Sequence, residues 1–177
     1  MNISSSIANY SESQFYRFYY KGNEDARLTD NRSSIPKSRL ISADSDALRR
    51  AIGTLSGIFD SSNTNGKEIY NAVRAFSNTY NNVITSSSST EYHDIASLRK
   101  SIKGLSSKQQ SELEMIGISI TNGGKLSIDE DKLKSSNPAR VKKLFSEDSE
   151  FMKQLNKYAK RLSSRSSTSG NILDVEA

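Results

Sequence analysis

Apolar residues recur every three or four positions along most of the chain, the spacing that places them on one face of a helix. The pattern is clear over residues 45–59, 67–84, 92–105 and 148–163. In the second and third ranges the steps of three and four alternate, as they do in the seam of a coiled coil. These seam residues are Ile69, Val73, Phe76, Tyr80, Ile95, Leu98 and Ile102. The pattern predicts an antiparallel helical bundle with a coiled-coil-like stalk.

Polar residues that favour helix ends stand next to several of these ranges. Ser42 or Asp44 is expected to cap the helix that begins at about residue 45. Ser106 and Gln109 form the S-x-x-Q pattern of a capping box, which predicts a short helix after residue 106. The Asn-Pro pair at 137–138 predicts the start of another short helix.

Between residues 117 and 129 the period changes to two, which indicates a β-hairpin. Ile118 and Ile120 precede the turn, and Leu126 and Ile128 follow it. A three-residue loop that ends at Gly124 pairs Ile120 with Leu126, and it requires a positive φ at Gly124. All four aliphatic side chains then share one face. Because a two-stranded hairpin is not stable alone, we expect this face to pack on the helices and close the open end of the bundle.

Two segments without such a pattern flank the bundle. We expect an irregular or partly disordered N-terminal arm over residues 1–40, a helical stalk domain over 41–163 and a flexible tail over 164–177. The arm holds the aromatic cluster Phe15, Tyr16, Phe18, Tyr19 and Tyr20. These side chains either dock on the helices or a neighbouring subunit, or anchor a partner protein, since aromatic residues are common at interface hot spots.

Few residues could carry catalysis or bind a metal. His93 is the only histidine and the chain has no cysteine, which excludes a histidine triad and thiolate ligands. The loop at 61–66 lacks the acidic first and twelfth positions of a calcium-binding EF-hand. The consecutive acidic residues at 129–131 point in different directions and are expected to serve as helix N-terminal charges. We therefore expect no enzyme, no metal site and no cofactor.

Charge and hydropathy narrow the range of partners. The net charge is +5, with 25 basic and 20 acidic residues, and the basic excess lies mainly in residues 153–165. This mixture is typical of solvated helix surface, whereas nucleic-acid binding would need a denser basic face. No apolar run approaches the roughly 20 residues of a membrane helix, so no membrane insertion is expected. The N-terminus has neither the basic nor the apolar region of a secretory signal.

Two motifs within residues 71–161 resemble the C-terminal part of the bacterial flagellar filament-capping protein, hook-associated protein 2. LEMIGISITNGGKLSIDEDKL, over residues 113–133, is similar to the family's L-x-x-I-G-I followed by G-x-L-x-x-D-x-x-K-L. NPARVKKLF, over residues 137–145, is similar to its N-P-x-x-V-x-x-L-F. The Tyr80–Asn81 pair near the end of a helix is a third point of likeness.

This resemblance implies a helical stalk with a small hairpin and a structural role in flagellar assembly. Family members are exported, oligomerise at the filament tip and help flagellin subunits fold into place. They insert a large β-rich head within the stalk sequence, where this chain has a short loop, and they carry a long C-terminal helix that we do not expect here.

We therefore expect a headless, shortened relative that is extracellular on the bacterial flagellum and works through protein–protein contacts. Its expected partners are flagellin, other flagellar proteins or further copies of itself. The alternative is a cytoplasmic helical adaptor or regulator that keeps the stalk fold without export.

Overall fold

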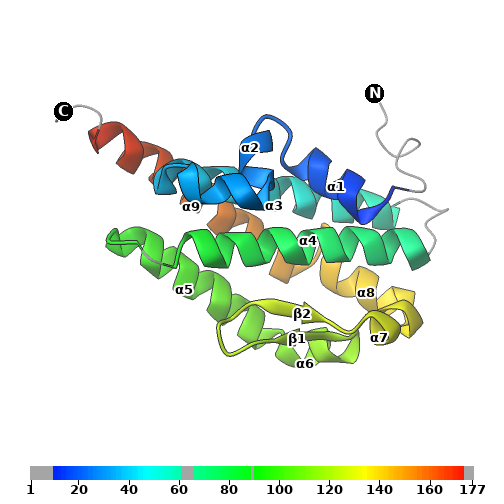
Figure 1. Ribbon diagram of the computed structural model, residues 1–177. Helices are drawn as coiled ribbons and strands as arrows, with labels where there is room; N and C mark the ends of the chain where they lie inside the picture. The colour runs from blue at the N-terminus through cyan, green and yellow to red at the C-terminus, as the bar shows by residue number, and fades with distance from the viewer. Residues whose placement is uncertain (1–9, 61–65, 89, 174–177) are drawn as a thin grey trace.

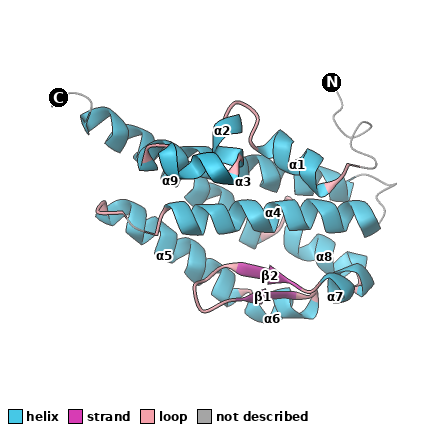
Figure 2. Ribbon diagram, viewed as in Figure 1, coloured by secondary structure: helices cyan, strands magenta, loops and turns pink. Residues whose placement is uncertain are grey.

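The computed structural model describes residues 10–60, 66–88 and 90–173, which form helices and one two-stranded sheet (Figure 1). The expected fold class, mainly α with a small β-hairpin, is confirmed (Figure 2). Our expectations for residues 1–9, for the loop at 61–65 and for residues 174–177 lie outside the described residues.

Within the described part of the chain, four long helices form an antiparallel bundle. They are α3 (Lys37–Asp60), α4 (Gly66–Ser86), α5 (His93–Lys108) and α9 (Glu150–Leu173). α3 packs along both α4 and α9, and α5 packs along α9. Because Ser42, near the start of α3, contacts Ser163 and Ser167, near the end of α9, these two helices run in opposite directions.

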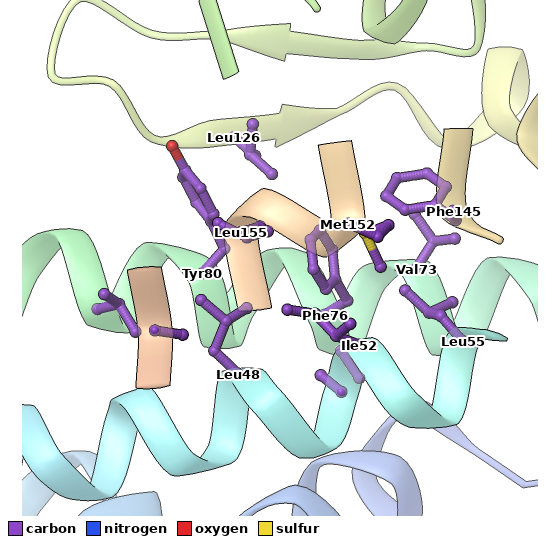
Figure 3. Packing of buried hydrophobic residues seen from close by; sticks show 14 of the residues in the cluster. Leu48, Ile52, Leu55, Val73, Phe76, Tyr80, Leu126, Phe145, Met152 and Leu155 are labelled. Atoms are coloured by element: carbon purple, nitrogen blue, oxygen red, sulfur yellow. The ribbon is translucent and has the colours of Figure 1, made fainter. Parts of the chain in front are cut away.

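The seam residues lie in the interior of this bundle. Val73, Phe76, Tyr80, Ile95 and Ile102 are fully buried, Leu98 is buried, and Ile69 is half-buried near the start of α4. They meet apolar residues of α3, α9 and α8 (Pro138–Phe145), several of which are labelled in Figure 3. The rings of Phe76 and Phe145 pack edge to face, with centroids 5.4 Å apart. The seam thus holds this chain's own helices together.

The hairpin consists of β1 (Ile118–Ile120) and β2 (Leu126–Ile128), in the register that the sequence predicts. Ile118 pairs with Ile128 and Ile120 with Leu126, and Gly124 has a φ of 80°. Ile118 and Leu126 are buried, whereas Ile120 and Ile128 are half-buried against the same core. The expected position was wrong: the hairpin lies alongside α4 and does not close an end of the bundle (Figure 1).

Two helices are longer than the sequence pattern indicates. α3 begins at Lys37, so Ser42 and Asp44 are interior residues of the helix and do not cap it. α9 continues to Leu173 through the Ser-rich segment that we expected to be a flexible tail. Ser167 of this segment and the preceding Ser163 face Ser42 of α3, with both Oγ–Oγ distances at 3.2 Å, and Ser166 of the segment is fully buried. Packing against α3 outweighs the weak helix propensity of serine.

Three short helices stand next to the hairpin in the chain: α6 (Gln110–Met115) before it, and α7 (Glu130–Ser135) and α8 after it. α6 packs against β1, α7 against α4, and α8 against α3 and α9. The expected Asn-Pro start of α8 is present, with the Asn137 side chain accepting a hydrogen bond from the Ala139 amide. The expected capping box at residues 106–109 is absent: α5 runs on to Lys108, and no side chain caps α6. The Ser106 side chain instead lies in the core, where it has another role.

The N-terminal arm is helical rather than irregular. It contains α1 (Glu12–Tyr19), α2 (Glu24–Arg27) and the 3-10 helix η2 (Thr29–Ser34). A capping box starts α1, since the Ser11 side chain accepts a hydrogen bond from the Gln14 amide and the Gln14 side chain accepts one from the Ser11 amide. From here on, "the arm" means residues 10–36. It packs across α3 and α4 (Figure 1).

Candidate assembly surfaces

Most of the aromatic cluster of the arm is buried within this chain. Phe15, Tyr19 and Tyr20 are fully buried, and Tyr16 is half-buried. Phe18 is different, because 40% of its surface remains exposed. Of the five candidate partner-binding residues, Phe18 alone therefore offers a largely open ring to another molecule.

A polar cluster around Asp44 fixes the arm to α3. Asp44 is fully buried and accepts hydrogen bonds from the Tyr20 hydroxyl at 2.7 Å and from both terminal nitrogens of Arg32 at 2.9 and 2.7 Å. Burial, then the charge of Asp44, raises the pKa of Tyr20 well above its ordinary value. Burial alone would lower the pKa of Arg32, but its hydrogen bonds and ion pair with Asp44 outweigh that effect and raise it. No local pattern in the sequence indicates this cluster, because Arg32 and Tyr20 are 12 and 24 residues away from Asp44.

Further polar contacts fix the arm to α4. The Asn82 side chain donates to the Tyr16 and Tyr20 hydroxyls at 2.6 and 2.8 Å, and Arg74 forms an ion pair with Glu12 at 2.9 Å. The arm thus bonds to both α3 and α4 of its own chain. Its aromatic residues act as an internal anchor in this structure.

Tyr80 and Asn81 connect α4 to the hairpin. The Tyr80 hydroxyl donates to the Gly124 carbonyl at 3.2 Å and accepts from the Ser106 hydroxyl at 2.9 Å. The Asn81 amide bonds both backbone groups of Leu126, donating to its carbonyl at 2.8 Å and accepting from its N–H at 2.7 Å. Burial raises the pKa of Tyr80 to about 12, so this hydroxyl is a neutral donor at physiological pH.

This contact explains why a Tyr-Asn pair stands at this point in the sequence. In the part of the chain that the structure describes, the hairpin has no neighbouring strand on the outer side of β2. There the Asn81 side chain takes the place of such a strand and bonds the backbone N–H and carbonyl of Leu126. Sequence reasoning identified the pair only through its likeness to a family and missed its role. An asparagine directly after a seam tyrosine is the signal that was present.

The surface contains apolar and concave regions that are open to other molecules. Among the residues whose burial the structure describes, the large apolar side chains with the greatest exposure are Phe18, Leu28, Tyr92 and Met115. One groove lies between α6, α8 and the start of α9, and it carries both signs of charge, including Glu112, Arg140 and Asp148. A second lies between α3 and α9, and Arg49, Glu147 and Lys153 line it with Gly53 and Gly57.

A third groove runs along the outer face of α5, and we call it the α5 groove. Its lining includes four small residues, Ala96, Ser97, Gly104 and Ser107, which we call its floor. It also includes the cationic residues Arg99, Lys100 and Lys103, which we call its walls, together with His93. The volume of the groove is about 590 Å³.

Among the described residues, those considered above for catalysis or metal binding do not come together in a site. His93 is exposed at the first position of α5. The Asp129 side chain caps α7, and Glu130 pairs with Lys134 and Arg74. No group of three or more histidine, cysteine or acidic residues in the described part of the chain could hold a metal ion. None of the described helices is both long and apolar enough to span a bilayer.

Comparison with known proteins finds one related family. The family described as flagellar hook-associated protein 2 C-terminus matches residues 92–176, an interval that begins just before α5 and includes the hairpin and α9. The arm, α3 and α4 lie outside this match. No curated protein and no solved structure matches the chain.

Proposed function

We propose that this protein is a structural component of flagellar assembly that acts through protein–protein contacts and is not an enzyme. The proposal rests on the match of residues 92–176 to the family described as flagellar hook-associated protein 2 C-terminus. The observation that carries the proposal is the family match over α5–α9. The hydrogen bonds from Tyr80 and Asn81 to the hairpin backbone, which we call the clamp, connect α4 to the matched hairpin. They support extending the family's fold to α4.

The finer proposal is a headless, shortened relative of the filament cap. The family resemblance places a large head within the stalk sequence, whereas residues 61–65 alone separate α3 from α4 here. α9 extends through 24 residues, so the matched region ends in a long helix that we did not expect. A stalk of this kind would act at the flagellum, outside the cell, against flagellin, other flagellar proteins or further copies of itself.

The first experiment locates the protein. The full chain, tagged and expressed in its native cells, is followed by immunoblot in cytoplasm, culture supernatant and sheared flagella. We expect it in the sheared flagella. A cytoplasmic protein with no extracellular fraction would favour the alternative, a helical adaptor that keeps the stalk fold without export.

A second experiment tests the role itself. Deleting the gene should shorten the filaments or release flagellin into the medium, measured by electron microscopy and by quantifying secreted flagellin. Complementation with the wild-type gene is the control. Unchanged filament length and flagellin retention, together with a cytoplasmic location, would exclude an assembly role.

A further inference from the structure

The α5 groove differs from the other two grooves in the sign of its charge. Among its described lining residues, Arg99, Lys100 and Lys103 are cationic and none is acidic. The other grooves include Glu112, Asp148 and Glu150, or Glu147, beside their basic residues. Asp94 is the nearest acidic residue along α5, and it faces Arg165 of α9 at 3.7 Å. The α5 groove is therefore complementary to a negative partner.

The cations of this groove are not used within the described part of the chain to neutralise carboxylates. Arg99 donates to the Ser88 carbonyl at 3.2 Å, and neither Lys100 nor Lys103 forms an ion pair with a described residue. The stem of Lys103 lies against Gly124 of the hairpin turn, which fixes the position of this wall. Lys100 is exposed.

The floor of the groove permits the close approach of another backbone. Ser97, Gly104 and Ser107 are exposed, and positions 97, 100, 104 and 107 recur at steps of three, four and three along one face of α5. This is the spacing at which a second helix contacts a helix face. The long side chain of Lys100 separates Ser97 from the small pair Gly104 and Ser107 on this face. Glycine weakens a helix interior relative to alanine, yet a Cβ at Gly104 would meet no atom of the described chain within 4 Å. Internal packing therefore does not require glycine here.

From this combination of small floor and cationic walls, we propose that the outer face of α5 is a docking site for an acidic amphipathic helix of another flagellar protein. The inference rests on the proposed function. The partner's backbone lies over Gly104 and Ser107, and its carboxylates face Arg99, Lys100 and Lys103. Charge of this kind governs the rate of encounter and the salt dependence of binding.

The test uses the purified full chain and intact flagella sheared from cells that lack the protein. Binding is measured by co-sedimentation at increasing protein concentration, at low and at moderate salt. Lys100→Glu removes one cation, and its control is Lys157→Glu on the exposed surface of α9. Gly104→Gln fills the floor without adding charge, and its control is Gly66→Gln at the start of α4, where a Cβ also meets no described atom within 4 Å.

We expect the apparent affinity to fall about tenfold for Lys100→Glu and for Gly104→Gln, to stay unchanged for both controls, and to weaken with salt. Circular dichroism melts check folding, and Gly104→Gln should melt no lower than the wild type because glutamine favours a helix over glycine.

Each other outcome overturns the inference in a recognisable way. Wild-type binding that both α5 variants retain would remove the docking site and leave the proposed function intact. Wild-type protein that binds no flagella at any salt concentration would remove both. Self-association of the purified chain that the α5 variants abolish, measured by sedimentation equilibrium, would identify a second copy as the occupant instead of an acidic partner.

Discussion

Tyr80 and Asn81 are neighbours on α4 whose side chains both reach the backbone of the hairpin. Tyr80 bonds the turn at Gly124, and Asn81 bonds both polar groups of Leu126. Since buried backbone groups need hydrogen-bond partners, these two residues compensate for the short strands. The link spans 44 and 45 residues along the chain.

Removing the Tyr80 hydroxyl should destabilise the protein. We expect Tyr80→Phe to lower the free energy of unfolding by about 1–3 kcal/mol, because the Gly124 carbonyl loses its donor and Ser106 an acceptor. Tyr19→Phe is the matched control, since the buried Tyr19 hydroxyl has no hydrogen-bond partner among the described residues. Its effect should be close to zero. Urea unfolding of both variants measures the difference, and equal losses would contradict the role given to Tyr80.

Single residues show where sequence reasoning succeeds and where it fails. The pairing of Ile118 with Ile128 was predictable because alternation and a three-residue loop leave one register with a common apolar face. The burial of Asp44 was not predictable, because a carboxylate is normally exposed and its partners Tyr20 and Arg32 come from other elements. Local spacing contains no information about such distant contacts.

Tertiary contacts decide where a helix begins and ends, so the same capping pattern can start a helix at one position and not at another. The S-x-x-Q pattern occurs at Ser11–Gln14 and at Ser106–Gln109, and only the first forms a capping box. Ser106 is already buried against Tyr80 in the interior of α5. The sequence thus predicted the existence of most helices better than their boundaries.

The connection between β1 and its neighbours depends on Gly117, just after α6. Its φ is 84°, and a Cβ there would lie 2.9 Å from the Leu133 nitrogen and 3.0 Å from the Asp129 carbonyl oxygen. Gly22 has a similar φ of 82°, but a Cβ there would meet no described atom within 4 Å. The two glycines therefore share the backbone constraint and differ in the available space.

We expect Gly22→Ala to cost about 1–2 kcal/mol from the positive φ alone. Gly117→Ala should cost a further 1–3 kcal/mol, roughly, because α7 has to move away from the new methyl group. Denaturant unfolding of the two variants separates the effects. If both lose the same free energy, α7 does not press on Gly117 as the structure indicates.

The docking of the arm is an element-scale property that depends on one buried carboxylate. We expect Asp44→Ala to cost about 3–5 kcal/mol, because it leaves the largely buried Arg32 without its partner and Tyr20 without an acceptor. Asp46→Ala is the control, since Asp46 pairs with Arg49 near the surface at 3.5 Å and should cost less than about 1 kcal/mol.

Limited proteolysis of the Asp44→Ala protein should cut the arm before the bundle. An arm that remains as resistant as in the wild type, with unchanged stability, would mean that the apolar contacts of Phe15 and Tyr19 hold it without the ion pair.

On the scale of the whole molecule, burial of tyrosines makes stability depend on alkaline pH. Burial is the first cause of a raised pKa at Tyr16, Tyr19, Tyr20, Tyr70 and Tyr80. A tyrosine of the unfolded chain titrates near pH 10, so the folded state holds protons that the unfolded state releases above that pH. The stabilising contribution is complete below about pH 10 and is lost as the pH rises through the folded pKa values.

We therefore expect the free energy of unfolding to be flat with respect to these groups below about pH 9 and to fall between about pH 10 and 12, by up to about 1.4 kcal/mol per pH unit for each buried tyrosine. Phenolate absorbance at 295 nm and far-ultraviolet circular dichroism, followed together, measure this. Ionisation of these five tyrosines near pH 10 with the helices intact would contradict their burial.

The arrangement of the whole molecule was only partly accessible from the sequence. Helical periodicity fixed the fold class, because it records which side of each helix meets a core. It did not reveal that the hairpin lies alongside α4 or that the arm covers α3 and α4. Those positions depend on pairs such as Asn81 with Leu126 and Tyr20 with Asp44, which have no periodic trace.

The clamp between α4 and the hairpin also sets an order of events during folding. Strands of three residues cannot hold each other, and the side chains that bond their backbone, Tyr80 and Asn81, belong to α4. Ser106 of α5 bonds the Tyr80 hydroxyl in turn. α4 and α5 therefore have to pack together before the hairpin is held in place. In addition, a loop of more than 40 residues has to close between Asn81 and Leu126. In a refolding experiment with pulsed hydrogen exchange, the amides of β1 and β2 should gain protection after those of the helices, so this small sheet would report the completion of the native state.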